Sequence, residues 1–548
     1  MFTDPIESSA EVVRLRQQAH YWRSLHAAAV PREAAAKEKI LQLEQKVRQQ
    51  ESEIQELRGQ LEKLEAERAL LRQMIFGQKS EQSPPSVAPA PEDPPPPNVP
   101  AGPQERRKRG KQPGSRGYGR KRRDELPTEE MEHHLPCEQH YCPQCGKPLQ
   151  VFPGTEDSQE IEWEVRLFRR IHKRTRYRPT CHCGAVPGIL TAPPPPKLIP
   201  KGLFSIGFWV QVLLEKFLLQ RPLYRIGQRL LLHGLDVSQS TLTGGLQRMV
   251  PLFQPLYAAF LEHNRAAHHW HMDETRWMVF EELEGKSGHR WWLWVVVTAE
   301  TCVYLLDPSR SSQVPKNHLG PNPKGILNVD RYAAYKAFQV SCENLRLAYC
   351  WSHVRRDFVR IRDGYPRLHA WSHAWVENIN ALFDHNAQRL QVRSQADPFA
   401  VQDRLLREQL NTFQQTCEQE LAQSTLHPMQ RKVLESLRNH WPGLTVFVDH
   451  PEIPMDNNEA ERRLRNPVVG RKNYYGSGSL WSGMLSAMLF TIFQTLLLNR
   501  LDPQKYLTAY FEACAQNTGR PLESVEAFLP WKLSEEQKTA WRYRERPP

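Results

Sequence analysis

A heptad pattern of apolar positions runs from Glu33 to Ile75. Both seam positions are apolar except at Gln50 and Arg68, and no proline interrupts the stretch. One seam position carries Ile40, Val47, Ile54, Leu61, Arg68 and Ile75, and the other carries Leu43, Gln50, Leu57, Leu64 and Leu71. Such a stripe needs a second helix to cover it, so the pattern predicts an oligomerising coiled coil within residues 1–80. A single long solvated helix is the alternative.

Apolar and alternating stretches further along the chain predict a sheet. We expect five strands, at residues 268–277, 290–298, 302–306, 325–330 and 345–350. Three antiparallel strands followed by alternating strands and helices is the order of the ribonuclease-H-like fold. The pattern then stays helical over residues 365–441, which we interpret as an insertion. The chain is therefore expected to be a multidomain α+β protein with an α/β catalytic domain at 263–500 and a helical tail at 501–548.

The stretch before the sheet, residues 196–262, is predicted to be helical. An apolar helix at 203–219 is followed by two segments, 221–232 and 238–250, that are separated by a turn at Gly234. Ser238 is a good cap for the second segment. This pair resembles a helix-turn-helix, a pattern that many short helix pairs share, and we interpret the region as DNA-binding.

Residues 81–125 form a linker of two parts. The first, 84–103, is rich in proline and favours an extended spacer. The second carries a dense basic run, and the whole chain has a net charge of +12. A run this dense repels itself unless phosphates neutralise it, so we expect DNA-backbone contacts, with a solvated tail as the alternative. The residues expected to make these contacts are Arg106, Arg107, Lys108, Arg109, Arg120, Lys121, Arg122 and Arg123.

Two cysteine pairs predict a zinc module at 126–195. Cys142 and Cys145 form a knuckle ending in glycine, and Cys181 and Cys183 supply the second pair. Four thiolates around one Zn²⁺ make a closed structural site. The tight second pair leaves the ligand set open, because Cys137, His140 or His182 could replace one thiolate. Free buried thiols are the alternative.

The cysteine content and the apolar runs indicate the cellular compartment of the protein. Ten cysteines in 548 residues are too sparse for a disulfide scaffold, which favours a reducing compartment. We find no uninterrupted apolar run of about 18 residues and no signal-like N-terminus. We therefore expect a cytoplasmic, nucleoid-associated protein with no membrane segment.

Three carboxylates mark the predicted catalytic site. Asp273 and Asp330 are expected at strand ends, and Glu461 stands one turn into a late helix. In that helix Asp456 is predicted as the N-cap, and Glu459 as its capping-box partner, which leaves Glu461 free. Converging carboxylates with only oxygen ligands favour two Mg²⁺ or Mn²⁺ ions, which can activate the attacking oxygen of phosphodiester chemistry. Taken singly, each acid could instead end a strand, cap a helix or form an ion pair.

The chain resembles DDE transposases of the insertion-sequence-66 family over nearly its whole length. The resemblance is carried by FGQKSE, CPQCG, CHC, APPPPKLIPKG, LYRIGQRLLLHGLDVSQSTL, HMDET, NVDRYAAY, CWSHVRRDF and DNNEAERRLRNPVVGRKN. It implies cleavage at transposon ends and strand transfer, with Asp273, Asp330 and Glu461 as the triad. It also implies double-stranded DNA and small accessory proteins of the same element as partners. Arg331 is a departure, because the family usually has glycine after the second aspartate.

A cysteine, a histidine and four basic residues are also predicted near the site. Cys350 and His353 are similar to the C-x-x-H signature beside many such sites, and we favour packing support over a second zinc site. Four basic residues flank the carboxylates and are expected to contact phosphates: Arg355, Arg356, Arg471 and Lys472. For Arg355 and Arg356, surface ion pairs are the alternative.

The sequence thus predicts a DNA transposase that hydrolyses phosphodiester bonds and transfers strands. Two other functions fit the same sequence features. One is a non-catalytic, zinc-containing DNA-binding regulator, and the other is a ribonuclease-H-like nuclease that cuts without joining.

Overall fold

The computed structural model describes residues 5–76, 165–178, 189–282 and 288–543, with isolated positions at 130, 143–145, 147, 148 and 284. The predicted basic run and three of the four predicted zinc ligands, Cys142, Cys181 and Cys183, lie outside the described residues. Cys145 is described and is an exposed free thiol. A two-stranded antiparallel ribbon pairs β1 (Arg176–Tyr177) with β2 (Leu190–Thr191).

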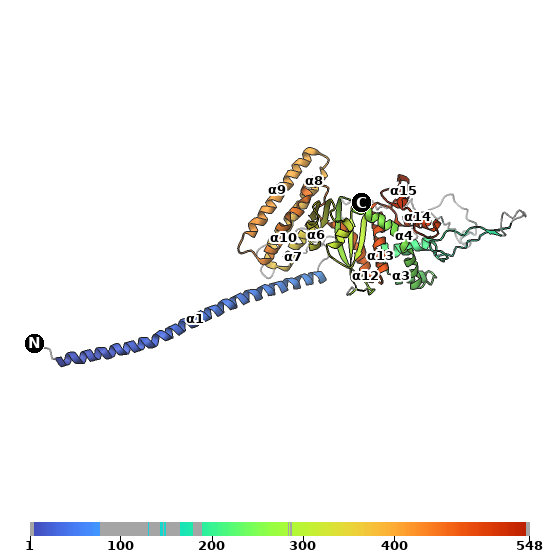
Figure 1. Cartoon of the computed structure of the whole chain (residues 1–548). Helices are drawn as coiled ribbons and strands as arrows, with labels where there is room; N and C mark the ends of the chain where they lie inside the picture. Colours follow the sequence, from blue (N-terminus) through green and yellow to red (C-terminus); the bar gives the residue numbers. More distant parts are fainter. Residues whose placement is uncertain are drawn as a thin grey trace. The chain divides into compact units, whose positions relative to one another are not determined.

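The N-terminal segment is one long helix, α1 (Pro5–Phe76), shown in blue in Figure 1. The predicted helix is confirmed, and it begins well before the heptad pattern. Its seam side chains are about half exposed, for example Ile40 at 55%, Leu57 at 56% and Leu64 at 62%. At these positions the rest of the described chain leaves the apolar stripe uncovered, so the heptad pattern still predicts a second helix as its partner.

A mixed sheet forms the centre of the protein. It consists of β3 (His269–Val279), β4 (Arg290–Val297), β5 (Cys302–Asp307), β6 (Gly325–Val329) and β7 (Leu345–Tyr349), in the order β5-β4-β3-β6-β7. The first three strands are antiparallel, whereas β6 lies parallel to β3 and β7 parallel to β6. A short strand, β8 (Gly476–Ser477), extends the far end of β3. All five predicted strands are confirmed.

The edge of the sheet at β5 is covered by the apolar helix α13 (Leu480–Leu498). Thr495 and Thr491 accept hydrogen bonds from the backbone N–H groups of Cys302 (3.0 Å) and Tyr304 (2.9 Å). These hydroxyls satisfy edge groups that would otherwise invite a further strand. By length and composition α13 could cross a membrane, but 72% of this stretch is buried inside the protein. Serine, threonine and glutamine interrupt its apolar run, so the sequence pattern did not single it out.

The helices before the sheet match the prediction in kind. The first is α2 (Ile206–Leu213), continued by a π-helical turn, η2 (Leu214–Leu218). The predicted pair is α3 (Leu223–Leu232) and α4 (Gln239–Arg265), and the Ser238 hydroxyl accepts from the N–H of Thr241 as a cap should. Helix α4 is longer than predicted because its second half is buried in the core.

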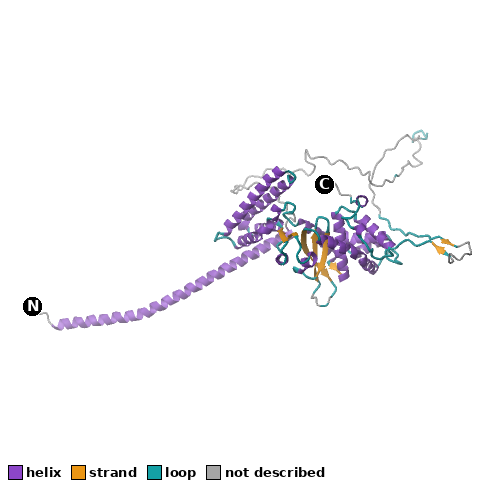
Figure 2. Ribbon diagram, turned by 45° about the horizontal axis from the view of Figure 1, so that its top comes forward, coloured by secondary structure: helices purple, strands orange, loops and turns teal. Residues whose placement is uncertain are grey.

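One helix follows each of β5, β6 and β7, and the predicted insertion is helical throughout. The first three are α5 (Gln313–Leu319), α6 (Ala333–Val340) and α7 (Trp351–Gly364). The insertion comprises η3 (Pro366–Leu368), α8 (His369–Gln391), α9 (Ala396–Leu421), α10 (Pro428–Leu444) and α11 (Val446–Asp449). Figures 1 and 2 show the long helices of the insertion gathered to one side of the sheet, and Figure 1 places α8, α9 and α10 away from α13 and α4.

The C-terminal segment is part of the same core rather than a separate tail. It contains α14 (Pro503–Gln516), η4 (Glu526–Phe528) and α15 (Glu535–Ala540). Tyr510 and Phe511 of α14 are fully buried, and the Tyr510 hydroxyl donates to the carbonyl of Leu252 in α4. One continuous cluster of buried apolar side chains runs from Leu198 to Leu533.

Candidate functional site

Asp273 and Asp330 occupy equivalent positions on two neighbouring parallel strands. The register of β3 and β6 pairs His271 with Asn328, and each aspartate lies two residues beyond its member of this pair. Side chains two residues apart along a strand share a face. Asp330 follows the end of β6, as predicted, and accepts from the N–H of Tyr332 (2.9 Å). Asp273 differs from the prediction, because it lies inside β3, whose pairing with β4 continues to Met278.

The electrostatics of Asp273 show that the acidic residues converge. Burial, followed by the charges of Glu274, Asp330 and Glu461, raises the pKa of Asp273 to about 8, against one opposing hydrogen bond from the N–H of Glu274. Like charges near a buried carboxyl disfavour its ionised form. The structure thus brings the three predicted acids within electrostatic reach of one another.

Two buried amides fix the loop that leads into α12 (Asn458–Tyr474). Asn328 of β6 donates to the carbonyls of Pro454 (3.0 Å) and Asp456 (3.3 Å). Asn457 donates to the carbonyl of Met272 (2.8 Å), so its Oδ1 is left to accept from Nδ1 of His271 (3.1 Å). Burial lowers the pKa of His271 to about 4, which keeps this ring neutral. These contacts fasten the start of α12 to the strands that carry the aspartates.

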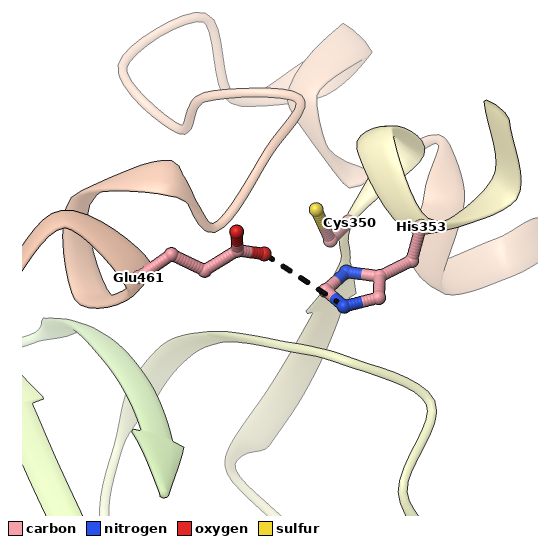
Figure 3. A group of neighbouring side chains, drawn as sticks. All are labelled: Cys350, His353 and Glu461. Carbon is pink, nitrogen blue, oxygen red and sulfur yellow. Dashed lines mark ion pairs between the residues drawn. The ribbon is translucent and has the colours of Figure 1, made fainter. Parts of the chain in front are cut away.

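Glu461 lies in the first turn of α12 and faces α7. Its Oε1 is 3.7 Å from Nε2 of His353, and its Oε2 is 3.8 Å from a guanidinium nitrogen of Arg356. Figure 3 shows Glu461, His353 and Cys350 pointing toward one another from α12 and from the start of α7. Within the described residues, these three form the group whose metal-ligand atoms all lie within 4.8 Å of one another. Asp273, Asp330 and Glu461 do not meet that spacing together.

The predicted capping of α12 is wrong in detail. The N-cap is Asn457, one residue after Asp456, and the helix shows no capping box. Asp456 instead accepts from the N–H of Asn458 (3.2 Å) in a local turn. Glu459 binds Arg462 and Arg463, at 2.5 Å and 2.8 Å, because the helix places residues three and four apart on one face. Although partial burial alone would raise its pKa, these arginines bring the pKa of Glu459 below its ordinary value. Glu459 is thus held by arginines of its own helix, whereas Glu461 faces His353 and Arg356 of α7.

A second acid beside Asp273 was missed by the sequence reasoning. The side chain of Glu274 is 1% exposed and accepts from Arg310 (Nε–Oε1 2.7 Å) and from the hydroxyl of Tyr335. The guanidinium of Arg310 in turn stacks over the rings of Trp292 (4.7 Å) and Tyr332 (3.9 Å). The adjacent acids Asp273 and Glu274 were the available sequence signal. A second buried acid needs a cation beside it, so the pair indicates that a basic residue, here Arg310, must lie close to Glu274.

Some of the basic residues predicted to contact phosphates bond to other protein groups, whereas others are exposed. Arg355 donates to Asn380 (2.8 Å), and Arg471 donates to the Thr275 hydroxyl and the Arg276 carbonyl (2.8 Å each). Arg471 therefore supports β3, whereas Lys472 is exposed. The Arg331 side chain is turned toward α7 and α10, where it binds Asp357 and Ser436 (2.9 Å to the latter).

Two residues at the end of α12 bond to the turn at Gln220. Asn473 donates to the backbone carbonyl of Gln220 (2.9 Å), and Tyr474 donates to the Gln220 side chain (2.6 Å). Gln220 has a φ of 57°, so these bonds hold the left-handed turn after η2.

Comparison with known proteins places this arrangement in a family. Residues 201–485 match the family model described as Transposase IS66 family. Three relatives from Sinorhizobium fredii (strain NBRC 101917 / NGR234) are similar over most of their length. "Uncharacterized protein y4hP" is 24% identical over 413 residues, which cover 71% of this chain and 73% of the relative. "Uncharacterized protein y4jD" is 26% identical (67% and 73% covered), and "Uncharacterized protein y4qI" is 26% identical (71% and 73% covered). No solved structure matches the chain. The family model covers more than half of the chain, including both aspartates and Glu461, and the protein therefore belongs to the IS66 family of transposases.

Proposed function

We propose that the protein is a DDE-type DNA transposase in which Asp273, Asp330 and Glu461 form the catalytic triad. The observation that supports this most directly is the convergence of the three acids. Two lie at equivalent positions of adjacent parallel strands, the third begins the helix fastened to those strands, and all three are coupled electrostatically. The strand order β5-β4-β3-β6-β7, with three antiparallel and two parallel strands, is the order of a ribonuclease-H-like fold and supports the same proposal.

The donor set fits hard divalent cations. The three acids offer only oxygen ligands, the type that Mg²⁺ and Mn²⁺ prefer. Burial and the neighbouring acidic charges raise the pKa of Asp273, and a bound divalent cation would favour its ionised form. Two such ions would activate the attacking oxygen and stabilise the leaving one during phosphodiester hydrolysis and strand transfer. The chain's own residues hold the carboxylates in place: Asn328 and Asn457 fix α12, and Arg310 neutralises the neighbouring Glu274.

We propose DNA as the partner of the surface around Asp273, Asp330 and Glu461. The net charge of +12 favours a polyanion. Among the flanking basic residues, Lys472 is the exposed candidate for a phosphate contact, and Arg356 lies beside Glu461. The basic run at 106–123 and the helix pair α3–α4 are proposed as further DNA contacts, and the four cysteines as a structural zinc site. We propose that copies of the chain associate through α1 and act in the cytoplasm on transposon ends and target DNA, together with accessory proteins of the same element.

The test is cleavage and joining of a labelled DNA that carries the element's own ends, in Mg²⁺ or Mn²⁺. Wild type is compared with Glu461→Gln, and Glu459→Gln is the matched control because its acid lies two residues away and binds only arginines of its own helix. We expect Glu461→Gln to lower cleavage at least about a hundredfold while DNA binding persists, and Glu459→Gln to keep cutting.

Each other outcome identifies a different function. A protein that cuts but yields no joined product is a nuclease. A wild type that binds the ends and never cuts, even with the accessory proteins, is a DNA-binding regulator. A chain that needs Glu459 and not Glu461 overturns the assignment of the third acid.

A further inference from the structure

The side chains of Cys350, His353 and Glu461 converge at the junction of α7 and α12 (Figure 3). We propose that they form a binding site for a thiophilic divalent cation of the Zn²⁺ class, and that this cation withdraws Glu461 from the catalytic triad. The withdrawal rests on the proposed function, whereas the binding site does not. The site is distinct from the predicted four-cysteine module, with which it shares no residue.

The spacing of the ligand atoms fits an ion better than a direct contact. Nε2 of His353 and Oε1 of Glu461 are 3.7 Å apart, which is longer than a hydrogen bond. Two ligands of a tetrahedral Zn²⁺, with bonds of about 2.0–2.2 Å, lie roughly 3.3–3.6 Å from each other. The sulfur of Cys350 completes a group in which all ligand atoms lie within 4.8 Å. Small rotations of the side chains would therefore close the three ligands on one ion.

Two buried atoms of this group lack hydrogen-bond partners. Oε1 of Glu461 and Nδ1 of His353 are both inaccessible to solvent and unpaired within the part of the chain that the structure describes. Unpaired buried polar atoms destabilise a protein and are uncommon. The Oε2 atom of Glu461 faces Arg356, so the orphan Oε1 is the oxygen that remains for a cation.

Two backbone N–H groups donate to the sulfur of Cys350, although burial raises the pKa of its thiol to about 11. The N–H of Asn457 donates to the sulfur (3.3 Å), and the N–H of His353 also contributes a hydrogen bond. Both donors stabilise negative charge on the sulfur once a cation replaces its proton. One thiolate, one imidazole and one carboxylate form a donor set for Zn²⁺, Co²⁺ or Cd²⁺, whereas Mg²⁺ requires oxygen ligands. Three protein ligands leave one position for water.

The binding test uses Co²⁺, because a cysteine-bound cobalt ion absorbs in the near ultraviolet and Mg²⁺ does not. The background is the full chain with Cys142, Cys145, Cys181 and Cys183 changed to serine, which removes the predicted distal module. We expect one Co²⁺ with a thiolate band, lost in Cys350→Ser and weakened at least about tenfold in His353→Gln and Glu461→Gln. Cys417→Ser is the matched control, since Cys417 is a buried free thiol of α9, and it should keep the band.

A second measurement guards against a background that does not fold. In the unmodified chain, Cys350→Ser should lower the number of thiolate-bound Co²⁺ ions by one, with an unchanged circular dichroism spectrum. Absence of a band in a folded background, or a band that survives Cys350→Ser, overturns the site.

The proposed withdrawal of Glu461 from the catalytic triad is tested by adding Zn²⁺ to the Mg²⁺-dependent cleavage assay. We expect micromolar Zn²⁺ to inhibit wild type and the Cys350→Ser variant to need at least about tenfold more Zn²⁺ for the same fractional inhibition. Equal sensitivity of the two proteins overturns the withdrawal of Glu461. Because cobalt binding is measured without DNA, a protein that binds Co²⁺ through Cys350 but never cuts retains the site and contradicts the proposed function instead.

Discussion

Asp273 and Asp330 each lie two residues beyond the paired His271 and Asn328 on neighbouring parallel strands. Side chains two residues apart along a strand point to the same face of the sheet. Asp273 therefore shares a face with His271, and Asp330 shares a face with Asn328. His271 and Asn328 both bond to the loop at 454–457 that begins α12. One register therefore determines the positions of both aspartates and of the helix that supplies Glu461. A shift of β6 by one residue would turn Asp330 to the other face.

The raised pKa of Asp273 leads to a prediction about stability in the absence of divalent cations. Its ordinary value is 3.8, and the folded value is about 8. Between these values the folded protein holds one proton more than the unfolded chain, so stability contributed at this residue falls as pH rises from 4 to 8. Asp273→Asn removes the ionisation. We expect it to be more stable than wild type in EDTA at pH 8, with a difference that shrinks toward pH 5.

The size of this difference follows from the shift. One pKa unit corresponds to about 1.4 kcal/mol, so even half of the shift would give roughly 3 kcal/mol at pH 8. Thermal unfolding followed by circular dichroism in EDTA measures it. Added Mg²⁺ should reduce the difference, because the cation replaces the missing proton. A melting temperature of wild type equal to that of Asp273→Asn at every pH would contradict the proposed burial of charge.

Asn457 is predicted to matter both for stability and for the position of Glu461. Its side chain is 1% exposed and bonds to the Met272 carbonyl and to His271. Asn457→Ala leaves both of these buried groups unpaired, so we expect a loss of about 2–4 kcal/mol in the free energy of unfolding, together with reduced cleavage. Denaturant unfolding and the cleavage assay check the two effects.

The control for Asn457 is the next residue. The Asn458 side chain bonds only to Asp456 in the same turn, at 2.6 Å. Asn458→Ala should cost less than about 1 kcal/mol. If both alanine variants unfold alike, the buried contacts of Asn457 do not hold the start of α12.

Much of the fold around the candidate site could be predicted from the sequence because its signals are local. The run at Arg290–Thr298 is apolar enough to be a buried strand under any arrangement, and Ser238 caps its helix through contacts three residues away. Glu461 was distinguished from Glu459 by a predicted capping box, which the helix does not contain. Glu461 lies beside His353 and Arg356 of α7, and its role as the third catalytic acid stays a prediction.

The missed features depend on residues far apart in the chain. The N-cap of α12 is set by Asn457, whose bonds reach residues near 271, and no local pattern records them. Glu274 is buried because Arg310 and Tyr335 come from two later elements. The Arg331 side chain turns from the acids because Asp357 and Ser436 bind it from α7 and α10. Tertiary partners of this kind override local preference.

The heptad seam of α1 predicts self-association that one substitution can weaken. Leu57 lies on the seam and is 56% exposed in the isolated helix, whereas Leu41 lies off the seam and is 57% exposed. Leu57→Glu would place a charge in the interface of a coiled coil, but Leu41→Glu would place it in solvent. We expect the first variant to shift the protein toward smaller species in analytical ultracentrifugation and the second to sediment like wild type. Equal behaviour of the two variants would argue for a solvated single helix.

Two adjacent glycines of α4 predict opposite effects of the same substitution. A Cβ at Gly245 would lie 1.9 Å from the ring of Trp209, a fully buried side chain of α2 that cannot move aside without opening the core. A Cβ at Gly244 meets nothing within 4 Å. Alanine favours a helix over glycine by about 1 kcal/mol, so Gly244→Ala should stabilise the protein by up to that amount. Gly245→Ala gains the same propensity but overpacks the contact, and we expect a net loss of about 1–3 kcal/mol. Paired denaturant titrations measure both. A stabilising Gly245→Ala would mean that α2 and α4 do not pack through Trp209, and the helix pair proposed to contact DNA would then lack its support on the core.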